Sequence, residues 1–211
     1  MEKGHDATSP AQVAIFAAAC FAFFAMCRTG EITVRSASSP DPARACWSHL
    51  EETASAGVAA AVLHLPRDTT HANADFDRIA AEQQLMQAFC PVRALRAHRA
   101  LNAPAASGDL SSIGAFSYFI DDARTLRREL TASFFIDTVN GWLTAAQRPS
   151  VTGHSFRIGG ATFYFAAKKS LEDIRLRGGW KTDTHPLYLR ENHVRHAAVF
   201  GDIDPAGLYY G

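Results

Sequence analysis

The feature that most constrains the fold is an unbroken apolar run from Val13 to Cys27. A membrane-spanning helix needs about 20 apolar residues, so this run is too short to cross a bilayer. Residues 1–12 do not have the form of a signal peptide. We therefore expect a helix that is buried on all sides, with Ser9-Pro10 at its start and Arg28–Gly30 near its end. No membrane partner is expected.

The rest of the chain has the patterns of a mostly helical domain with a small antiparallel β-sheet, so the predicted fold class is α+β. Clusters of Ser, Pro, Ala and Gly predict loops at 36–43 and 102–112. Helices are predicted over 91–101, 131–143, 156–167, 171–177 and 186–190, and strands over 58–65 and 116–120.

The charge of the chain is balanced overall but unevenly distributed. There are 21 Lys and Arg residues against 21 Asp and Glu residues, whereas a DNA-binding domain is usually basic. Residues 1–92 contain 6 basic and 10 acidic residues, and residues 93–190 contain 14 basic and 8 acidic ones. The second half is therefore compatible with a polyanionic partner but does not require one.

The cysteines indicate a reduced, intracellular protein without a metal site. They form no Cys-x-x-Cys pair, and no His lies at a metal-ligand spacing from them. Cys20 and Cys27 are seven residues apart, so on one helix they would share a face, which we expect to be a core face. The other two are Cys46 and Cys90.

Two motifs carry residues suited to binding an anion. Residues 28–31 read Arg-Thr-Gly-Glu, directly after the apolar run. Residues 153–162 read Gly-His-Ser-Phe-Arg-Ile-Gly-Gly-Ala-Thr, at the start of a predicted helix. His154 and Arg157 are three residues apart, so on a helix they face the same way. The paired glycines of this motif predict close helix packing rather than a phosphate loop, because no Lys-Ser/Thr follows them.

A third motif completes a pattern of one protein family. Residues 179–183 read Gly-Trp-Lys-Thr-Asp, and Tyr188 follows Trp180 by eight residues. In order and spacing, the three motifs and this tyrosine resemble the tyrosine recombinase (phage integrase) family. The likeness spans roughly residues 10–190. The second motif, together with Trp in place of a second His, is similar to the eukaryotic transposon-borne members.

The resemblance implies an architecture and an activity. It implies a catalytic domain at 10–190, with an N-terminal extension at 1–9 and a C-terminal tail at 191–211. The activity is site-specific recombination or integration of double-stranded DNA, as in mobile elements, through a 3′-phosphotyrosine intermediate. It implies no metal and no cofactor. A homo-oligomer, typically a tetramer on DNA, and an intracellular, nuclear location are expected.

The resemblance gives two arginines the role of binding the phosphate. Nucleophilic attack on a phosphodiester adds negative charge to its oxygens, and guanidinium groups can hold these oxygens bidentately. Arg28 and Arg157 are expected to be this pair. Glu31 resembles the acidic residue beside the first arginine and is expected to orient it. Arg28 has an alternative role as a simple cap at the end of its helix.

Three further residues are expected to act on the reacting group. Tyr188 corresponds to the nucleophile, although the tail carries the rival tyrosines Tyr209 and Tyr210, which we interpret as packing residues. His154 corresponds to a general acid or base. The indole N–H of Trp180 is expected to donate to a non-bridging oxygen, and a core-packing role is compatible with this.

One residue of the family pattern is missing. Family members use a lysine on a β-hairpin turn to protonate the leaving 5′-oxygen. Thr69 occupies its place in residues 65–71, which read Leu-Pro-Arg-Asp-Thr-Thr-His. Arg67 and His71 are the candidate replacements, and histidine is the better proton donor near neutral pH. The chain has four lysines, all outside this hairpin: Lys3, Lys168, Lys169 and Lys181.

Two functions of different classes therefore stay open. One is an active DNA strand transferase. The other is a catalytically impaired, recombinase-derived domain that only binds DNA or protein. Family members also carry an N-terminal helical domain that clasps the DNA, so the sequence is either a fragment or a protein without that clamp. A serine hydrolase using Ser155 is not expected, because no Gly-x-Ser-x-Gly elbow surrounds it.

Overall fold

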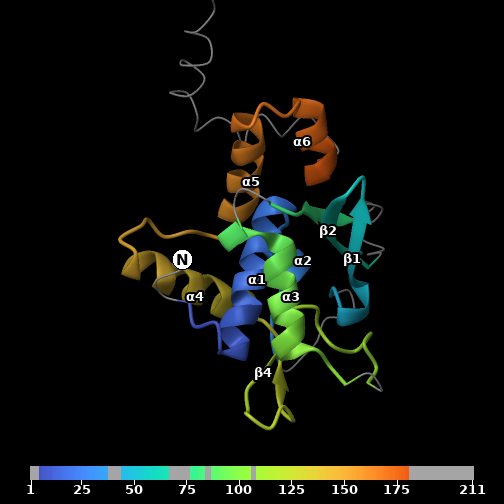
Figure 1. The fold of residues 1–211 in the computed structure, drawn as a ribbon. Helices are drawn as coiled ribbons and strands as arrows, with labels where there is room; N and C mark the ends of the chain where they lie inside the picture. Colours follow the sequence, from blue (N-terminus) through green and yellow to red (C-terminus); the bar gives the residue numbers. More distant parts are fainter. Residues whose placement is uncertain (1–4, 38–43, 67–76, 84–86, 106–107, 181–211) are drawn as a thin grey trace, which may run out of the picture.

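One buried helix lies at the centre of the fold. The computed structural model describes residues 5–37, 44–66, 77–83, 87–105 and 108–180. Helix α1 (Pro10–Phe24) runs through the middle of the molecule, and α3 (Pro91–Asn102) packs along it (Figure 1). Ten of the fifteen residues of α1 are buried and the other five are partly buried, so no face of the helix is exposed, as the apolar run predicts. No helix in the described residues has the length and apolarity that a bilayer crossing requires.

The start of α1 is as predicted, but its end is not. Ser9 is the N-cap, and its hydroxyl accepts a hydrogen bond from the Gln12 backbone N–H. The helix ends at Phe24 rather than near Arg28–Gly30, and Met26 has a positive φ of 50°. Cys27 therefore lies beyond the helix, so the prediction that it shares a helical face with Cys20 was wrong, although both thiols are buried.

A three-stranded antiparallel sheet packs beside α1 and α3. Its order is β1 (Leu50–Ser55), β2 (Val58–Leu63), β3 (Arg78–Ala81). Ala56 and Gly57 both have positive φ, as the two central residues of a type I′ hairpin turn require. Only β2 was predicted. The sequence of β1, Leu-Glu-Glu-Thr-Ala-Ser, lacks apolar alternation, and β3 has only four residues.

Two groups of elements lie at the two ends of α1. The short hairpin formed by β4 (Tyr118–Phe119) and β5 (Arg127–Arg128) lies at one end, and α5 and α6 lie at the other (Figure 1). The predicted N-cap Thr131 starts α4. The predicted helix at 186–190 lies outside the described residues. The helices are α2 (Thr29–Ile32), α4 (Ala132–Ala145), α5 (Ser155–Ala166) and α6 (Leu171–Gly178), with 3-10 turns at Trp47–His49 and Gln87–Phe89.

A buried polar pair on α3 ties the core together. His98 is fully buried, and its Nε2 donates to the carbonyl of Ala115 (3.1 Å). Its Nδ1 accepts from Nδ2 of Asn102 (3.1 Å). The Asn102 amide is fixed in orientation, because Nδ2 also donates to the Pro10 carbonyl and Oδ1 accepts from the Phe119 N–H. The neutral imidazole is thus built into the junction of α1, α3 and β4.

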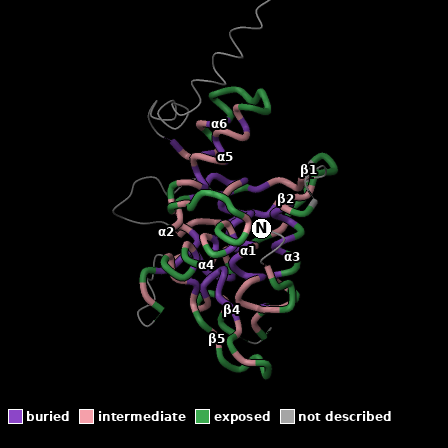
Figure 2. Tube along the Cα trace, turned by 90° about the vertical axis from the view of Figure 1, so that its left-hand side faces the viewer, coloured by how far each residue is buried: buried purple, intermediate pink, exposed green. Residues whose placement is uncertain are grey.

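Burial follows this arrangement. Purple, buried chain is concentrated around α1, while exposed chain covers the hairpin tips and the outer end of α6 (Figure 2). At the C-terminal end of α1, side chains of α5 bind one carbonyl of the helix and one of the turn that follows it. Oη of Tyr164 donates to the Phe24 carbonyl (2.9 Å), and Nη1 of Arg157 donates to the Met26 carbonyl (3.1 Å). The C-terminal end of α1 is therefore bound to α5 at both ends of that helix.

The crossing of α1 and α5 depends on Gly160, and this makes a first prediction. A Cβ at this position would lie 2.1 Å from the Phe23 carbonyl oxygen and 2.9 Å from Cγ of Met26. The close helix packing predicted for the paired glycines is therefore confirmed. Gly160→Ala is expected to lower the free energy of unfolding by about 1–3 kcal/mol, because backbone must move to admit the methyl group. Urea denaturation measures this change.

The matched control is Gly141→Ala, on α4. Gly141 is also helical, but a Cβ there meets nothing within 4 Å. We expect this variant to be as stable as the parent or up to about 1 kcal/mol more stable, since alanine is the better helix former. If both variants unfolded at the same urea concentration, the tight crossing at Gly160 would not be a constraint on the fold.

Candidate active site

Two of the sequence motifs meet around one cavity. The first follows α1, and the second forms the start of α5. Together they enclose a cavity of about 150 Å³, ample space for a phosphate group. The cavity thus brings together Arg28, His154 and Arg157, which are far apart in the sequence. Its lining residues are Arg28, Thr29, Gly30, Gly153, His154 and Arg157.

The two walls of the cavity are joined directly. Oγ1 of Thr29 donates a hydrogen bond to the Gly153 carbonyl (2.8 Å). A Cβ at Gly153 would lie only 2.6 Å from that hydroxyl oxygen. The absence of a side chain at Gly153 therefore lets the two motifs approach each other closely enough to form the site.

Arg28 is held at the cavity by the turn that it starts. Its backbone N–H donates to Oε2 of Glu31 (2.9 Å), and its Nη1 lies 3.4 Å from Oε1 of the same carboxylate. The Arg28 side chain is 53% exposed, whereas that of Glu31 is 14% exposed. Arg28 does not cap the end of α1; it is the N-cap residue of α2. Its guanidinium is anchored at one side and accessible at the other.

Arg157 is held rigidly inside the fold. It lies in the first turn of α5, is 1% exposed, and donates from Nη1 to the Met26 carbonyl. Its Cζ lies 4.2 Å from the ring centroid of Trp180, a cation–π contact. Trp180 is itself buried. It is therefore a core residue that also forms a platform for Arg157, whereas donation from its indole to a phosphate stays a prediction.

His154 lies at the rim of the cavity. It is the N-cap residue of α5, it is exposed, and its imidazole makes no capping hydrogen bond. The side chain lines the same cavity as Arg157, which follows it by three residues. This position is suitable for moving a proton to or from a group bound there.

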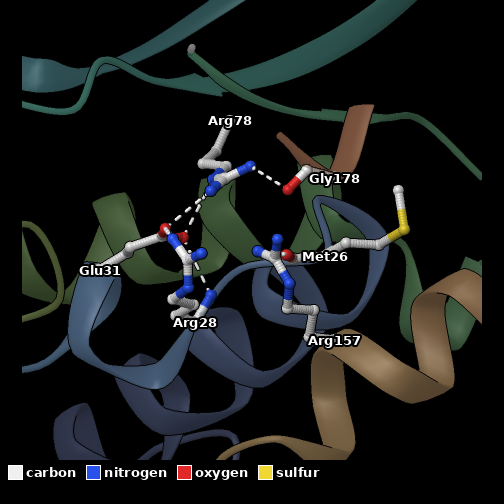
Figure 3. A network of polar contacts seen from close by, with 6 residues as sticks. All are labelled: Met26, Arg28, Glu31, Arg78, Arg157 and Gly178. Atoms are coloured by element: carbon white, nitrogen blue, oxygen red, sulfur yellow. Dashed lines mark hydrogen bonds and ion pairs between the residues drawn. The ribbon is translucent and has the colours of Figure 1, made fainter. Parts of the chain in front are cut away.

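Sequence reasoning missed one residue of this region, Arg78. It is the first residue of β3 and is only 3% exposed. Its Nε and Nη2 donate to the two carboxylate oxygens of Glu31 (2.9 and 2.7 Å), and its Nη1 donates to the Gly178 carbonyl (2.9 Å) (Figure 3). Burial opposes the charge, but the attraction and hydrogen bonds of Glu31 outweigh it and raise the pKa of Arg78.

The other predicted site residues lie outside the described residues. These are the predicted nucleophile Tyr188, the hairpin positions Arg67, Thr69 and His71, and the rival tyrosines Tyr209 and Tyr210. Their roles stay predictions from the sequence. Lys168 and Lys169, by contrast, are described and exposed at the end of α5.

The comparison with solved structures identifies the class of fold. No protein-family model and no curated protein matches the chain. The chain is similar in structure to a XerH site-specific recombinase bound to palindromic difH substrate, in a post-cleavage complex. The TM-score is 0.54 at 14% sequence identity, over 92% of this chain.

The similarity is one of fold, and it covers part of the neighbour. The match includes 46% of the recombinase chain, so this protein spans about half the length of the structure it resembles. The α+β architecture expected from the motifs, that of a tyrosine recombinase catalytic domain, is therefore confirmed.

Proposed function

We propose that this domain cuts and rejoins DNA strands through a covalent phosphotyrosine intermediate. The observation that carries the proposal is the cavity of about 150 Å³ shared by Arg28, His154 and Arg157. Two guanidinium groups and an imidazole around a phosphate-sized space suit the stabilisation of an anionic transition state. The fold shared with a site-specific recombinase supports the same activity.

The proposed reaction exchanges one phosphoester bond for another. The Tyr188 hydroxyl attacks phosphorus and gives up its proton, the Tyr–O–P bond forms, and the bond from phosphorus to the 5′-oxygen breaks. A tyrosine hydroxyl has an ordinary pKa of about 10, so a proton acceptor is needed, and His154, which lines the cavity, is the proposed acceptor. The leaving 5′-oxygen takes a proton, for which His71 is the candidate donor.

The two arginines have different tasks in this proposal. Arg157 is buried, stacked on Trp180 and fixed to the backbone, so it offers donors in a constant direction. Arg28 is half exposed and meets the DNA from the solvent side. Such preorganised positive groups stabilise charge as it develops on the phosphate, without reorganisation during the reaction. Double-stranded DNA is the proposed substrate, and a tetramer on DNA and a nuclear location stay predictions.

One observation favours a second candidate, a domain that binds DNA without cutting it. Thr69 stands where the family pattern has its proton-donating lysine. Threonine cannot replace an ammonium as a proton donor to an alkoxide. The binding-only function requires that neither Arg67 nor His71 takes over this step.

Trapping the covalent intermediate tests the proposal. The protein is incubated with supercoiled plasmid and with nicked oligonucleotides of randomised sequence, and adducts that survive SDS are isolated. We expect an adduct with the parent chain and with Tyr209→Phe, but none with Tyr188→Phe. Thr69→Lys is expected to increase the yield, because it restores a proton donor for the 5′-oxygen.

The absence of an SDS-stable adduct in every case would contradict the proposed reaction. If neither the parent nor Thr69→Lys formed an adduct, even when fused to a DNA-clamp domain, strand cleavage would be rejected. Retained DNA binding in a gel-shift experiment would then establish the binding-only function.

A further inference from the structure

We propose that Arg78 is a positioning residue of this site, which couples the carboxylate beside Arg28 to the tryptophan platform beneath Arg157. The inference rests on the proposed function and extends it to a residue outside the motifs. Arg78 does not line the cavity, so it is expected to act through its neighbours rather than on the substrate.

The first part of the coupling is the pair of hydrogen bonds from Arg78 to Glu31. Nε and Nη2 of Arg78 bind the two carboxylate oxygens in parallel, at 2.9 and 2.7 Å. The contact from Nη1 of Arg28 to the same carboxylate is longer, at 3.4 Å. A bidentate pair of this kind fixes the plane of the carboxylate. The orientation of Glu31 is therefore set by Arg78 together with the Arg28 backbone N–H (2.9 Å), and the Arg28 side chain contacts the carboxylate that they hold.

The second part of the coupling is a hydrogen bond from Arg78 to the end of α6. Its remaining terminal nitrogen, Nη1, donates to the Gly178 carbonyl (2.9 Å), two residues before Trp180. Gly179 ends α6 in the left-handed conformation, with φ of 64°. A Cβ at Gly179 would lie 2.8 Å from Nη1 of Arg78, and one at Gly178 would lie 1.7 Å from the Trp180 ring. The two glycines thus let the guanidinium and the indole approach the same piece of backbone.

The arrangement links both phosphate-binding arginines to one side chain. Glu31 and the Gly178 carbonyl lie on opposite sides of the Arg78 guanidinium, and Arg28 and Arg157 lie below them (Figure 3). Two of these guanidinium groups, those of Arg28 and Arg78, contact the Glu31 carboxylate, and Arg157 lies beside them. Only arginine has enough donors in a rigid fork to make these contacts simultaneously, so lysine is not an adequate replacement.

Fluorine NMR of the full chain labelled with fluorotryptophan tests the coupling without DNA. The chain has three tryptophans, and Trp180→Phe assigns the resonance of interest. In Arg78→Lys, which keeps the positive charge, we expect the Trp180 resonance to shift or broaden while those of Trp47 and Trp142 stay in place. Glu31→Gln is expected to change it in the same way, more weakly.

The matched control is a second Arg–Glu pair on the surface. Arg96 also binds a carboxylate bidentately, that of Glu52, but its side chain is 53% exposed. Arg96→Lys is expected to leave all three tryptophan resonances unchanged. An unmoved Trp180 resonance in both Arg78→Lys and Glu31→Gln would overturn the proposal.

The reaction provides an independent readout. Arg78→Lys is expected to slow adduct formation by about 10–100-fold with unchanged DNA affinity, as for other residues that hold catalytic groups in place. An unchanged rate would also overturn the positioning role. If neither the parent chain nor Thr69→Lys, even when fused to a DNA-clamp domain, forms an adduct, strand cleavage fails as the function, while the Trp180 resonance still decides whether Arg78 couples the two sides of the site.

Discussion

Arg157→Lys is expected to slow formation of the covalent DNA adduct by about 10²–10³-fold, the loss typical when one preorganised donor to a developing anion is removed. The ammonium keeps the charge but not the planar fork. It also cannot stack on the Trp180 ring while donating to the Met26 carbonyl, and both contacts help to orient the native guanidinium. Quenched-flow trapping of the adduct with SDS measures the rate.

The same substitution at Arg124 provides the control. Arg124 is exposed on the β4–β5 hairpin, at the end of the molecule opposite α5 and α6 (Figure 1). Arg124→Lys is expected to form the adduct at the parental rate. Should Arg157→Lys also react at that rate, with DNA saturating, the buried arginine would be a packing residue and not part of the phosphate site.

Acidification from about pH 7 to about pH 4 is expected to reduce the free energy of unfolding by about 3 kcal/mol through His98 alone. Burial lowers the pKa of His98 from 6.5 to about 4, and the hydrogen bond to the Ala115 carbonyl only partly opposes this. Between pH values of about 4 and 6.5, His98 carries a proton in the unfolded chain but not in the folded chain. The contribution is therefore complete above pH 6.5 and is lost as the pH falls towards 4.

The environment of His98 explains why the folded protein cannot accommodate a protonated imidazole at this position. A proton on Nδ1 would face Nδ2 of Asn102, which is also a donor. Asn102 cannot turn over, because its amide is held by the Pro10 carbonyl and the Phe119 N–H. Protonation of the buried ring thus costs both desolvation and a hydrogen bond.

A comparison of urea denaturation curves at several pH values isolates this effect. His98→Gln retains a donor and an acceptor but does not titrate, so its stability is expected to be lower at neutral pH and to fall less between pH 6.5 and about 4. Carboxylates titrate equally in both proteins, and the difference between the two profiles belongs to His98. Parallel profiles would refute the assignment.

The helices were predictable wherever their ends carry a local chemical signal. Ser9-Pro10 and Thr131 mark helix starts by side-chain capping, which depends on neighbours in the sequence. The end of α1 was not predictable, since the apolar run continues to Cys27 while the helix stops at Phe24. The turn after Phe24 is held by tertiary contacts, because side chains of α5 bind the carbonyls of Phe24 and Met26. Strands β1 and β3 were missed because pairing with β2, not their own pattern, makes them strands.

The residues of the candidate site were likewise predictable from the sequence only in part. The sequence motifs contain Arg28, His154 and Arg157, and the structure places all three on one cavity. Arg78 was missed because its partners Glu31 and Gly178 are 47 and 100 residues away. Nothing in the short strand around it indicates a buried arginine. The hairpin positions and Tyr188 were accessible to sequence reasoning alone, and their roles stay predictions.

The hydrogen bond between Thr29 and Gly153 spans 124 residues of sequence, and this separation has a consequence for protein synthesis. A ribosome adds residues at about 5–20 per second, so the first half of the site emerges on the order of ten seconds before the second. During that interval α1 has not yet packed against α5, and the cavity between the two motifs has not formed. A chain that ends before Gly153 therefore lacks one wall of the cavity, however well its first half folds.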